Sequence, residues 1–263
     1  MTMKPMSNVR WYARRTLDTL HYEGLPILLW RALAQCLSPF GRVQPWTFYR
    51  RDLTRPIAEM SAPAEITVTL ARESDVDQLA TLVARRYGPS PIGPYEKRGI
   101  QGTIVHRLRR GLRCFVARVG LDIVHYNWLA FQREESLGDT AALIVLQVGE
   151  AYCSDAFTVE RWRGKGIHTV VLRQMLVHAR EVGCRTIYTD VGSDNKSSWK
   201  THERLGWEVC GSALDFKARG THRIWRWHLR GGPSAFAATS RTLVSFSGSD
   251  DPGGRGAESQ PPR

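Results

Sequence analysis

The sequence has few lysines, and its cysteines are scattered. Only six of the 37 basic residues are lysine, so 31 are arginine, and the formal net charge is +12. A nucleic-acid site needs basic charge gathered on one face, and an arginine excess spread along the chain does not provide this, so we expect no nucleic-acid partner. The five cysteines form no C-x-x-C pair: Cys36, Cys114, Cys153, Cys184 and Cys210. This pattern argues against a zinc cage and a disulfide framework, and it predicts a cytoplasmic protein with no metal site.

Long apolar runs are also missing. No stretch of 18 residues lacks a charged side chain, so we expect no membrane-spanning helix. The apolar stretch 25–37 follows Arg14 and Arg15, but Pro26 and Arg31 interrupt it, so we expect no signal peptide. The chain has 263 residues, 42% of them hydrophobic, and no internal repeat, which indicates one domain with extensions.

Composition divides the chain into three regions. Residues 1–62 are predicted to be a basic helical extension, with helices near 8–21 and 26–37. This extension could rest on an anionic membrane or a partner protein, or it could pack on the main domain. Residues 63–230 are predicted to form the folded domain. Residues 231–263 are rich in Gly, Ser and Pro and are expected to be a disordered tail.

The middle region alternates strand and helix patterns. Ile66, Val68 and Leu70 alternate as in a strand, and a capping box at Ser74 and Asp77 then predicts a helix start. Further strands are expected at 113–119, 123–131, 141–148, 151–159, 186–191, 208–214 and 222–229. Further helices are expected near 97–110, from residue 167 to the stop at Gly183, and at 197–205.

A glycine-rich turn separates the strand 151–159 from the long helix. It reads Arg163-Gly164-Lys165-Gly166-Ile167-His168, and Arg161 adds a further positive charge. Two glycines at such a junction let the backbone approach a ligand, while the unpaired N–H groups of the helix face outward with its positive dipole end. A pyrophosphate is a natural ligand for this turn. The turn is not a Walker loop, because Lys165 is followed by Gly166, and it lacks the third glycine of the Rossmann fingerprint.

A second motif follows about thirty residues later. It runs from Asn195 to Trp207, Asn-Lys-Ser-Ser-Trp-Lys-Thr-His-Glu-Arg-Leu-Gly-Trp. With both motifs in this order, the chain resembles the GNAT superfamily of acetyl-CoA-dependent N-acetyltransferases. In that family a strand runs into a Gln/Arg-x-x-Gly-x-Gly/Ala loop, and an Asn…Ser/Ala…Tyr-Glu-Lys-Leu-Gly-Phe segment follows. Two departures are His168 at the last small position of the loop and His202 at the tyrosine position.

The resemblance implies an α/β (α+β) fold with a mixed, mostly antiparallel sheet of about seven strands flanked by helices. It also implies that acetyl-CoA is the acyl donor and lies between the strand ending at Val159 and the strand 186–191. The cofactor-binding residues it implies are Phe157, Thr158, Val159, Arg163, Gly164, Lys165, Gly166, Ile167, His168, Asn195 and Ser198.

The resemblance also suggests catalytic candidates. His202 would protonate the departing CoA thiolate, or else it fills an aromatic slot. Glu150 or Asp155 would accept the proton of the amine, and we favour Glu150, with Tyr152 as an orienting hydroxyl. By strand periodicity Glu150 and Tyr152 share one face and Asp155 lies on the other, unless a bulge intervenes. Cys153 is expected to be a packed thiol.

The acceptor is expected to be a small, anionic primary amine of the amino sugar or amino acid type. Arginines and aromatics that could line its pocket are Tyr95, Arg98, Arg107, Arg109, Arg110, Trp128 and Trp225. A protein amine, a longer acyl donor and a non-catalytic module that binds CoA or docks on a membrane or partner remain alternatives. The oligomeric state is not indicated.

Overall fold

The computed structural model describes most of the middle of the chain. The described residues are 41–60, 63–88, 95, 98–131, 134–136, 142–218, 224–229, 236–237 and 242–245, with eight single residues between 17 and 36. Those single residues are helical, and the rest of the helices expected at 8–21 and 26–37 lies outside the described residues.

The strands are β1 (Gly41–Asp52), β2 (Thr67–Leu70), β3 (Arg113–Val119), β4 (Asp122–Ala130), β5 (Glu134–Ser136), β6 (Ala142–Val145), β7 (Glu150–Thr158), β8 (Thr186–Gly192), β9 (Glu208–Ala218), β10 (Ile224–Leu229), β11 (Phe236–Ala237) and β12 (Thr242–Ser245). The helices are α3 (Val76–Tyr87), α4 (Gly99–Arg109), α5 (Ile167–Glu181) and α6 (Lys196–Arg204), with short 3-10 turns η1 (Glu73–Asp75) and η3 (Glu160–Trp162).

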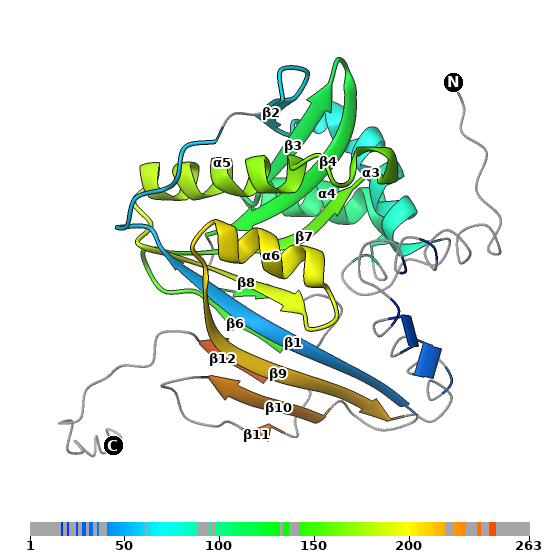
Figure 1. Ribbon diagram of the computed structural model, residues 1–263, viewed down its shortest axis with the longest axis vertical. Helices are drawn as coiled ribbons and strands as arrows, with labels where there is room; N and C mark the ends of the chain where they lie inside the picture. The colour runs from blue at the N-terminus through cyan, green and yellow to red at the C-terminus, as the bar shows by residue number, and fades with distance from the viewer. Residues whose placement is uncertain are drawn as a thin grey trace, which may run out of the picture.

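One large sheet organises the molecule (Figure 1). Within the described residues it has nine strands in the order β11-β10-β9-β1-β8-β7-β4-β3-β2. Neighbours run antiparallel except β7 and β8, which are parallel. The mixed, mostly antiparallel sheet expected from the sequence is confirmed. It exceeds the expected seven strands because β1 and β11 join it. The run expected at 141–148 is not part of it, since β6 pairs with β5 and β12 in a separate sheet.

Both ends of the chain differ from the expectation. Residues 41–52 were assigned to a helical extension, but they form β1, which pairs with β8 on one side and β9 on the other. Phe48 and Tyr49 are both buried, although they point to opposite faces. A strand buried on both faces lacks the polar alternation that identifies a strand in sequence, which explains the error. β11 and β12 lie in the region expected to be disordered, and the rest of that region lies outside the described residues.

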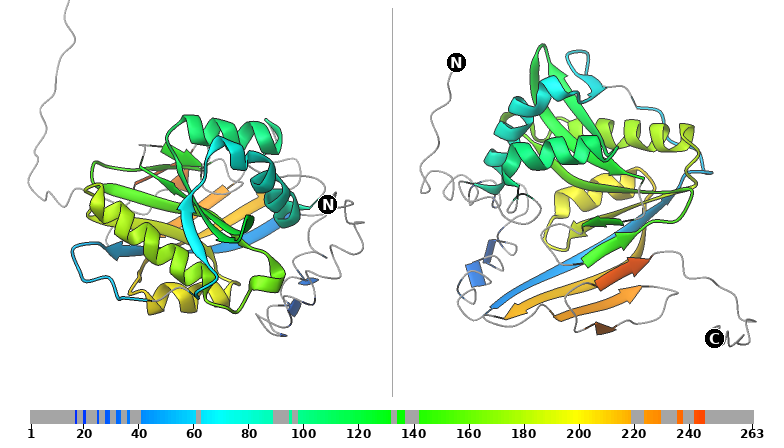
Figure 2. Two further views of the ribbon diagram at one scale, coloured as in Figure 1. Left: turned by 90° about the horizontal axis from the view of Figure 1, so that it is seen from above. Right: turned by 180° about the vertical axis from the view of Figure 1, so that it is seen from behind.

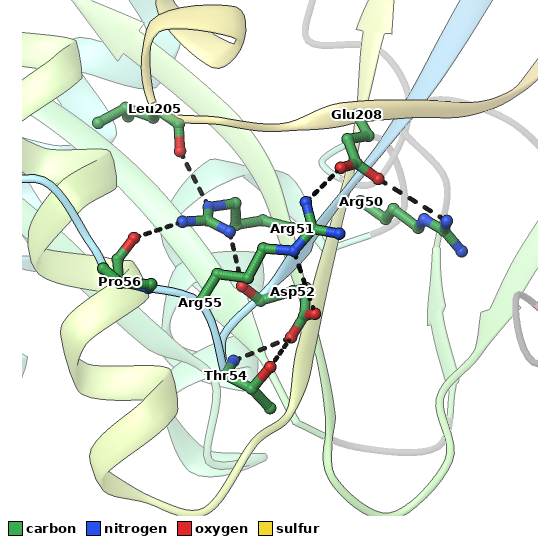
Figure 3. A network of polar contacts seen from close by, with 8 residues as sticks. All are labelled: Arg50, Arg51, Asp52, Thr54, Arg55, Pro56, Leu205 and Glu208. Carbon is green, nitrogen blue, oxygen red and sulfur yellow. Dashed lines mark hydrogen bonds and ion pairs between the residues drawn. The ribbon is translucent and has the colours of Figure 1, made fainter.

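Arg51 fastens the end of β1 to the rest of the fold (Figure 3). Its buried guanidinium donates from Nε to Leu205 O at 3.0 Å, from Nη1 to Asp52 O at 2.7 Å and from Nη2 to Pro56 O at 2.7 Å. A Cβ on Gly206 would lie 3.4 Å from Arg51 Nε, and Gly206 has φ +74. The Leu-Gly pair of the second motif is therefore fitted against β1.

Helices cover the two faces of the sheet. Seen from above, α3 and α4 lie on one side and α5 on the other, with the strands between them (Figure 2). Core residues on the α3/α4 side include Phe48, Leu79, Ile104, Trp128 and Tyr152. Those on the α5/α6 side include Ala151, Ile167, Met175, Ile187 and Leu205. None of the helices in the described part of the chain is long and apolar enough to cross a membrane.

Candidate active site

The two parallel strands of the sheet separate at the centre of the molecule. Pairing between β7 and β8 covers Glu150 to Cys153 against Thr186 to Thr189. β7 continues to Thr158 and β8 to Gly192, and no pairing joins these continuations. The edge of β7 that faces β8 over residues 154–158 therefore lacks a strand partner, and its backbone groups can receive an extended ligand.

The glycine-rich loop stands at the end of β7 and leads into α5. Gly164 has φ 76, and Gly166, the N-cap of α5, has φ 74. No side chain caps the first turn of α5, and a Cβ built on Gly166 would meet no atom within 4 Å. The N–H groups of Ile167 and His168 thus begin the helix without a side-chain cap. This arrangement can hold an anion.

The basic residues of this loop differ in their surroundings. Arg163 donates from Nε to Thr158 O at 3.1 Å, and its guanidinium lies 5.6 Å from the centre of the Phe157 ring. The Lys165 ammonium lies 4.1 Å from the centre of the Trp162 ring, and the residue is exposed. Arg163 thus braces the loop against β7, whereas Lys165 remains accessible to a phosphate.

Val159 is already engaged within the protein. Its N–H donates to Val124 O at 2.9 Å, and its carbonyl accepts from Trp162 N at 2.9 Å. Thr158 Oγ1 lies 2.7 Å from His125 Nδ1. Val159, which was expected to bind the cofactor and which directly follows β7, is therefore committed to the fold through both backbone groups.

The second motif forms the short helix α6. Asn195 is its N-cap, and its Oδ1 accepts from Ser198 N at 3.1 Å. His202 lies one turn later, with Nδ1 2.7 Å from Ser198 O and the ring stacked on Tyr49 at 5.5 Å. Asn195, Ser198 and His202 thus share one local network.

Burial lowers the pKa of His202 to about 4, although its hydrogen bond to Ser198 O opposes this. The ring is therefore neutral at neutral pH, and its Nδ1 proton is directed at a carbonyl that can only accept. An imidazolium was expected here to protonate the CoA thiolate. This geometry favours the other interpretation, in which His202 fills an aromatic slot.

Two further histidines adjoin His202, of which His125 is buried and His168 is partly buried. The His168 ring lies 5.3 Å from that of His125 and 5.9 Å from that of His202. Among the described residues, His125 Nε2, His168 Nδ1 and His202 Nε2 have no hydrogen-bond partner. Burial lowers the pKa of all three, that of His125 to about 3. The described residues contain no group of three His, Cys, Asp or Glu side chains arranged to hold a metal ion.

A bulge interrupts β7 next to β4. Tyr126 pairs with Phe157 and Trp128 with Ser154, so Asp155 and Ala156 together oppose Asn127. The extra residue reverses the alternation of side chains beyond it. Asp155 therefore points to the same face as Tyr152, which is the arrangement expected if a bulge intervenes.

Asp155 lies in a cluster of tyrosines and arginines. Its carboxylate is 6% exposed and pairs with Arg86 Nη1 at 3.0 Å and Arg107 Nη1 at 2.8 Å. Tyr87, Tyr95 and Tyr126 donate their hydroxyls to it. Burial alone would raise the pKa of Asp155, but the two guanidinium charges outweigh it and hold the pKa below its ordinary value. A carboxylate in this setting is a poor proton acceptor.

The other carboxylate candidate is Glu150, at the start of β7. It is 8% exposed, and it accepts from Gln147 N at 2.7 Å and from Tyr188 OH at 3.1 Å. It lies in the paired part of β7, five residues before the bulge, which corresponds to roughly 16 Å of extended strand. Glu150 and Asp155 therefore cannot serve one reacting amine together.

A third carboxylate was missed in the sequence. Asp190 is the first residue of β8 beyond its last pair with β7, and it accepts a hydrogen bond from Tyr152 OH. It is only partly buried. The strand 186–191 carries no signal for this role, since a single Asp near a strand end is common. Arg86 was also missed, because it reads as an ordinary charge in the last turn of a helix.

The expected acceptor-pocket residues fall into two groups. Tyr95, Arg107 and Trp128 are buried together, with the Arg107 guanidinium 5.3 Å from the Tyr95 ring centre and 5.2 Å from that of Trp128. Arg98, Arg109 and Arg110 lie on the exposed surface around α4. The side chain of Trp225 lies outside the described residues.

Comparison with known proteins agrees with this geometry. Residues 113–207, from β3 to the end of the second motif, match the family described as Acetyltransferase (GNAT) family. None of the curated proteins compared matches the chain.

Solved structures share the fold at low identity. A GCN5-related N-acetyltransferase from Sphaerobacter thermophilus is 16% identical with a TM-score of 0.52, covering 73% of this chain and 57% of that chain. A GNAT-family acetyltransferase from Colwellia psychrerythraea is 16% identical with a TM-score of 0.47, covering 72% and 62%. A Clostridium acetobutylicum protein solved with acetyl-CoA is 17% identical with a TM-score of 0.41, covering 54% and 90%. The present chain thus spans less than two thirds of the length of the Sphaerobacter and Colwellia proteins.

A mixed sheet that opens between its two parallel strands, beside a helix that begins at a glycine, is the fold that this chain shares with an N-acetyltransferase structure. Residues 113–207 match the GNAT acetyltransferase family model, and the chain shares its fold with a GCN5-related N-acetyltransferase. The resemblance inferred from its two motifs is confirmed, and the match to this family supports acyl-CoA-dependent acetyltransferase activity in general.

Proposed function

We propose that the protein is an N-acetyltransferase that moves an acetyl group from acetyl-CoA to a primary amine of a small acceptor. The observation that carries the proposal is the separation of β7 and β8 after Cys153 and Thr189, directly before the open N-terminus of α5. An extended thioester can lie along the unpaired edge of β7 while its pyrophosphate meets the helix.

The donor would be held by backbone groups more than by side chains. The N–H groups from Gly164 to His168 would receive the pyrophosphate, and Lys165 would add charge. Phe157 and Thr158 would flank the pantetheine. Asn195 and Ser198, at the N-terminus of α6, would line the other side of the opening.

The amine would attack the thioester carbonyl directly in a ternary complex. The nitrogen forms the new C–N bond, the C–S bond breaks, and CoA leaves as its thiolate. The ammonium must first lose a proton. We assign this step to Asp190, which lies where the strands separate and is oriented by Tyr152, because Asp155 is neutralised by two arginines.

The acceptor would approach from the face covered by α3 and α4, since Tyr152 and the Asp155 cluster lie there. We infer that it carries negative charge. Arg86, whose side chain is 31% exposed, would meet that charge at the end of α3. Amino acids and anionic amino sugars are acceptors of this kind.

Binding and turnover test the proposal separately. Acetyl-CoA and free CoA should each raise the melting temperature, and acetyl-CoA should release thiol in the presence of an amine from a panel of amino acids, amino sugars and peptides. Gly166→Glu should abolish the stabilisation by CoA, because it places a carboxylate and a strained backbone at the phosphate seat.

Gly183→Glu is the matched control. Gly183 follows the other end of α5, with φ 91 and open space around it, so the same change there costs stability without touching the phosphate seat. No acetyl-CoA binding at millimolar concentration would overturn the proposal. Binding without thiol release from any amine would instead indicate a non-catalytic module, and preference for longer acyl chains would change the donor.

A further inference from the structure

Asp155 has an unusual backbone conformation. Among the described residues it is the one non-glycine residue with positive φ, at 53°. It lies in the bulge of β7, two residues after the last pair of that strand with β8, so the strained residue belongs to the unpaired edge. Backbone strain of this kind persists only where the surroundings enforce it.

The surroundings of Asp155 provide that enforcement. Two guanidinium groups and three tyrosine hydroxyls, from α3, α4, β4 and Tyr95, converge on one carboxylate that is 6% exposed. Arg86 and Tyr87 are neighbours at the end of α3, and the other three partners come from separate places in the sequence. The carboxylate is thus fixed in position from several elements at once.

Arg86 links this carboxylate to the backbone. The same Nη1 atom that pairs with Asp155 Oδ1 also donates to Ala156 O. One guanidinium therefore holds both residues of the bulge, the first through its side chain and the second through its carbonyl. This contact sets the direction of the peptide groups that follow toward Phe157.

We propose that Asp155 is a positioning residue, which with Arg86 and Arg107 holds the bulge so that the unpaired backbone edge of β7 faces the acetyl end of the donor. This rests on the proposed function. It assigns Asp155 a role other than the proton acceptor for which its position on the strand suggested it. The strain at Asp155 is maintained because the reacting carbonyl needs fixed backbone donors.

Substitution at Asp155 separates backbone from carboxylate effects. Asn keeps the shape of the Asp side chain and tolerates positive φ. Gly tolerates positive φ but has no side chain. Ala neither keeps the side-chain shape nor tolerates positive φ. A positioning role predicts a graded loss of kcat/KM, smallest for Asp155→Asn and about 100-fold for Asp155→Ala, with the pH profile of the remaining activity unchanged. A proton acceptor would instead make all three variants equally poor and remove the acidic limb of the profile.

Arg86 supplies the second series. Arg86→Lys keeps the charge but cannot hold two oxygens with the same geometry, and Arg86→Met keeps only the stem. We expect both Arg86 variants to raise the rate of hydrogen–deuterium exchange of the segment 154–158 in the ligand-free protein. The increase should be larger in Arg86→Met than in Arg86→Lys. Asp77→Asn, an exposed carboxylate at the other end of α3, is the control and should leave exchange and turnover unchanged.

The exchange measurement needs no turnover. If the wild-type chain transfers no acetyl group, the proposed function fails while exchange still tests the bulge. Unchanged exchange over 154–158 in Asp155→Asn, Asp155→Gly and Arg86→Met would overturn the positioning role, as would equal activity of Asp155→Asn and Asp155→Ala. If Asp155→Ala does not fold, the activities of Asp155→Asn and Asp155→Gly are compared instead, and equal activities would overturn the positioning role.

Discussion

Three carboxylates on one face of the sheet have different surroundings, and these surroundings separate their roles. Asp155 is neutralised by two arginines. Glu150 accepts from a backbone N–H and from Tyr188 within the paired part of β7. Asp190 is partly buried, accepts from Tyr152, and stands at the point of separation of the strands. Position in the fold thus favours Asp190 for proton transfer.

Asp190→Asn should lower kcat by about 100-fold or more, because a positioned base contributes about that factor. Its pH–rate profile should lose the acidic limb, and a less basic acceptor amine should partly restore the rate. Steady-state kinetics from pH 5 to 9 would measure this. Glu150→Gln is the matched comparison and should retain most activity. A larger loss in Glu150→Gln than in Asp190→Asn would return the role to Glu150.

Single residues show where sequence reasoning reaches its limit. The loop glycines could be predicted, because left-handed φ at a strand-to-helix junction is a local requirement, and Gly164 and Gly166 both have it. The face on which Asp155 lies could not, because a bulge that depends on the neighbouring strand reverses the alternation. The state of His202 could not either, since its low pKa arises from burial by distant segments.

At the scale of elements, α5 could be predicted from its local sequence and β1 could not. The helix α5 has an apolar stripe, a glycine start and a glycine stop, so its bounds follow from local sequence. The strand β1 has Pro45 near its start and is buried on both faces in its middle, so its sequence shows no clear period. Its place in the sheet depends on β8 and β9, which lie more than a hundred residues away.

The packing of α5 and α6 on the sheet predicts acid sensitivity. His125 on β4, His168 on α5 and His202 on α6 lie together, the first and last buried and His168 partly buried. Burial lowers the pKa of His125 to about 3 and that of His202 to about 4. Arg86 also disfavours the charged form of His125. In the unfolded chain these groups would titrate near pH 6.5, so the unfolded state binds more protons below that pH.

Stability is therefore complete above about pH 6.5 and is lost as the pH falls toward 4. Each of these histidines should remove about 1.4 kcal/mol of unfolding free energy per pH unit in this range. Urea unfolding at pH 7.5 and pH 5 would measure the slope. Between pH 6.5 and 4, the unfolding free energy of His202→Phe should fall by about 1.4 kcal/mol per pH unit less than that of the wild type. An equal slope in both proteins would show that His202 does not titrate in this way.

At the scale of the whole molecule, the folded unit extends beyond the segment that carries the motifs. The family match begins at β3, and the composition suggested a boundary near residue 62. The sheet nevertheless takes β1 from residues 41–52 into its middle, between β8 and β9. A strand with neighbours on both sides contributes hydrogen bonds to both, so β9 and β10 reach the rest of the sheet through β1 alone among the described strands.

This topology predicts where the chain can be shortened. A variant beginning at residue 38 keeps β1 and should unfold cooperatively, whereas one beginning at residue 63 should not. The shorter variant loses the buried Phe48 and Tyr49, the strand partner of both β8 and β9, and the Arg51 contact with Leu205. Phe48→Ala in the full chain isolates one part of this loss and should cost about 3–5 kcal/mol. Circular dichroism with urea unfolding and gel filtration would measure all three proteins. Cooperative unfolding of the variant beginning at residue 63, near the midpoint of the full chain, would contradict the central position of β1.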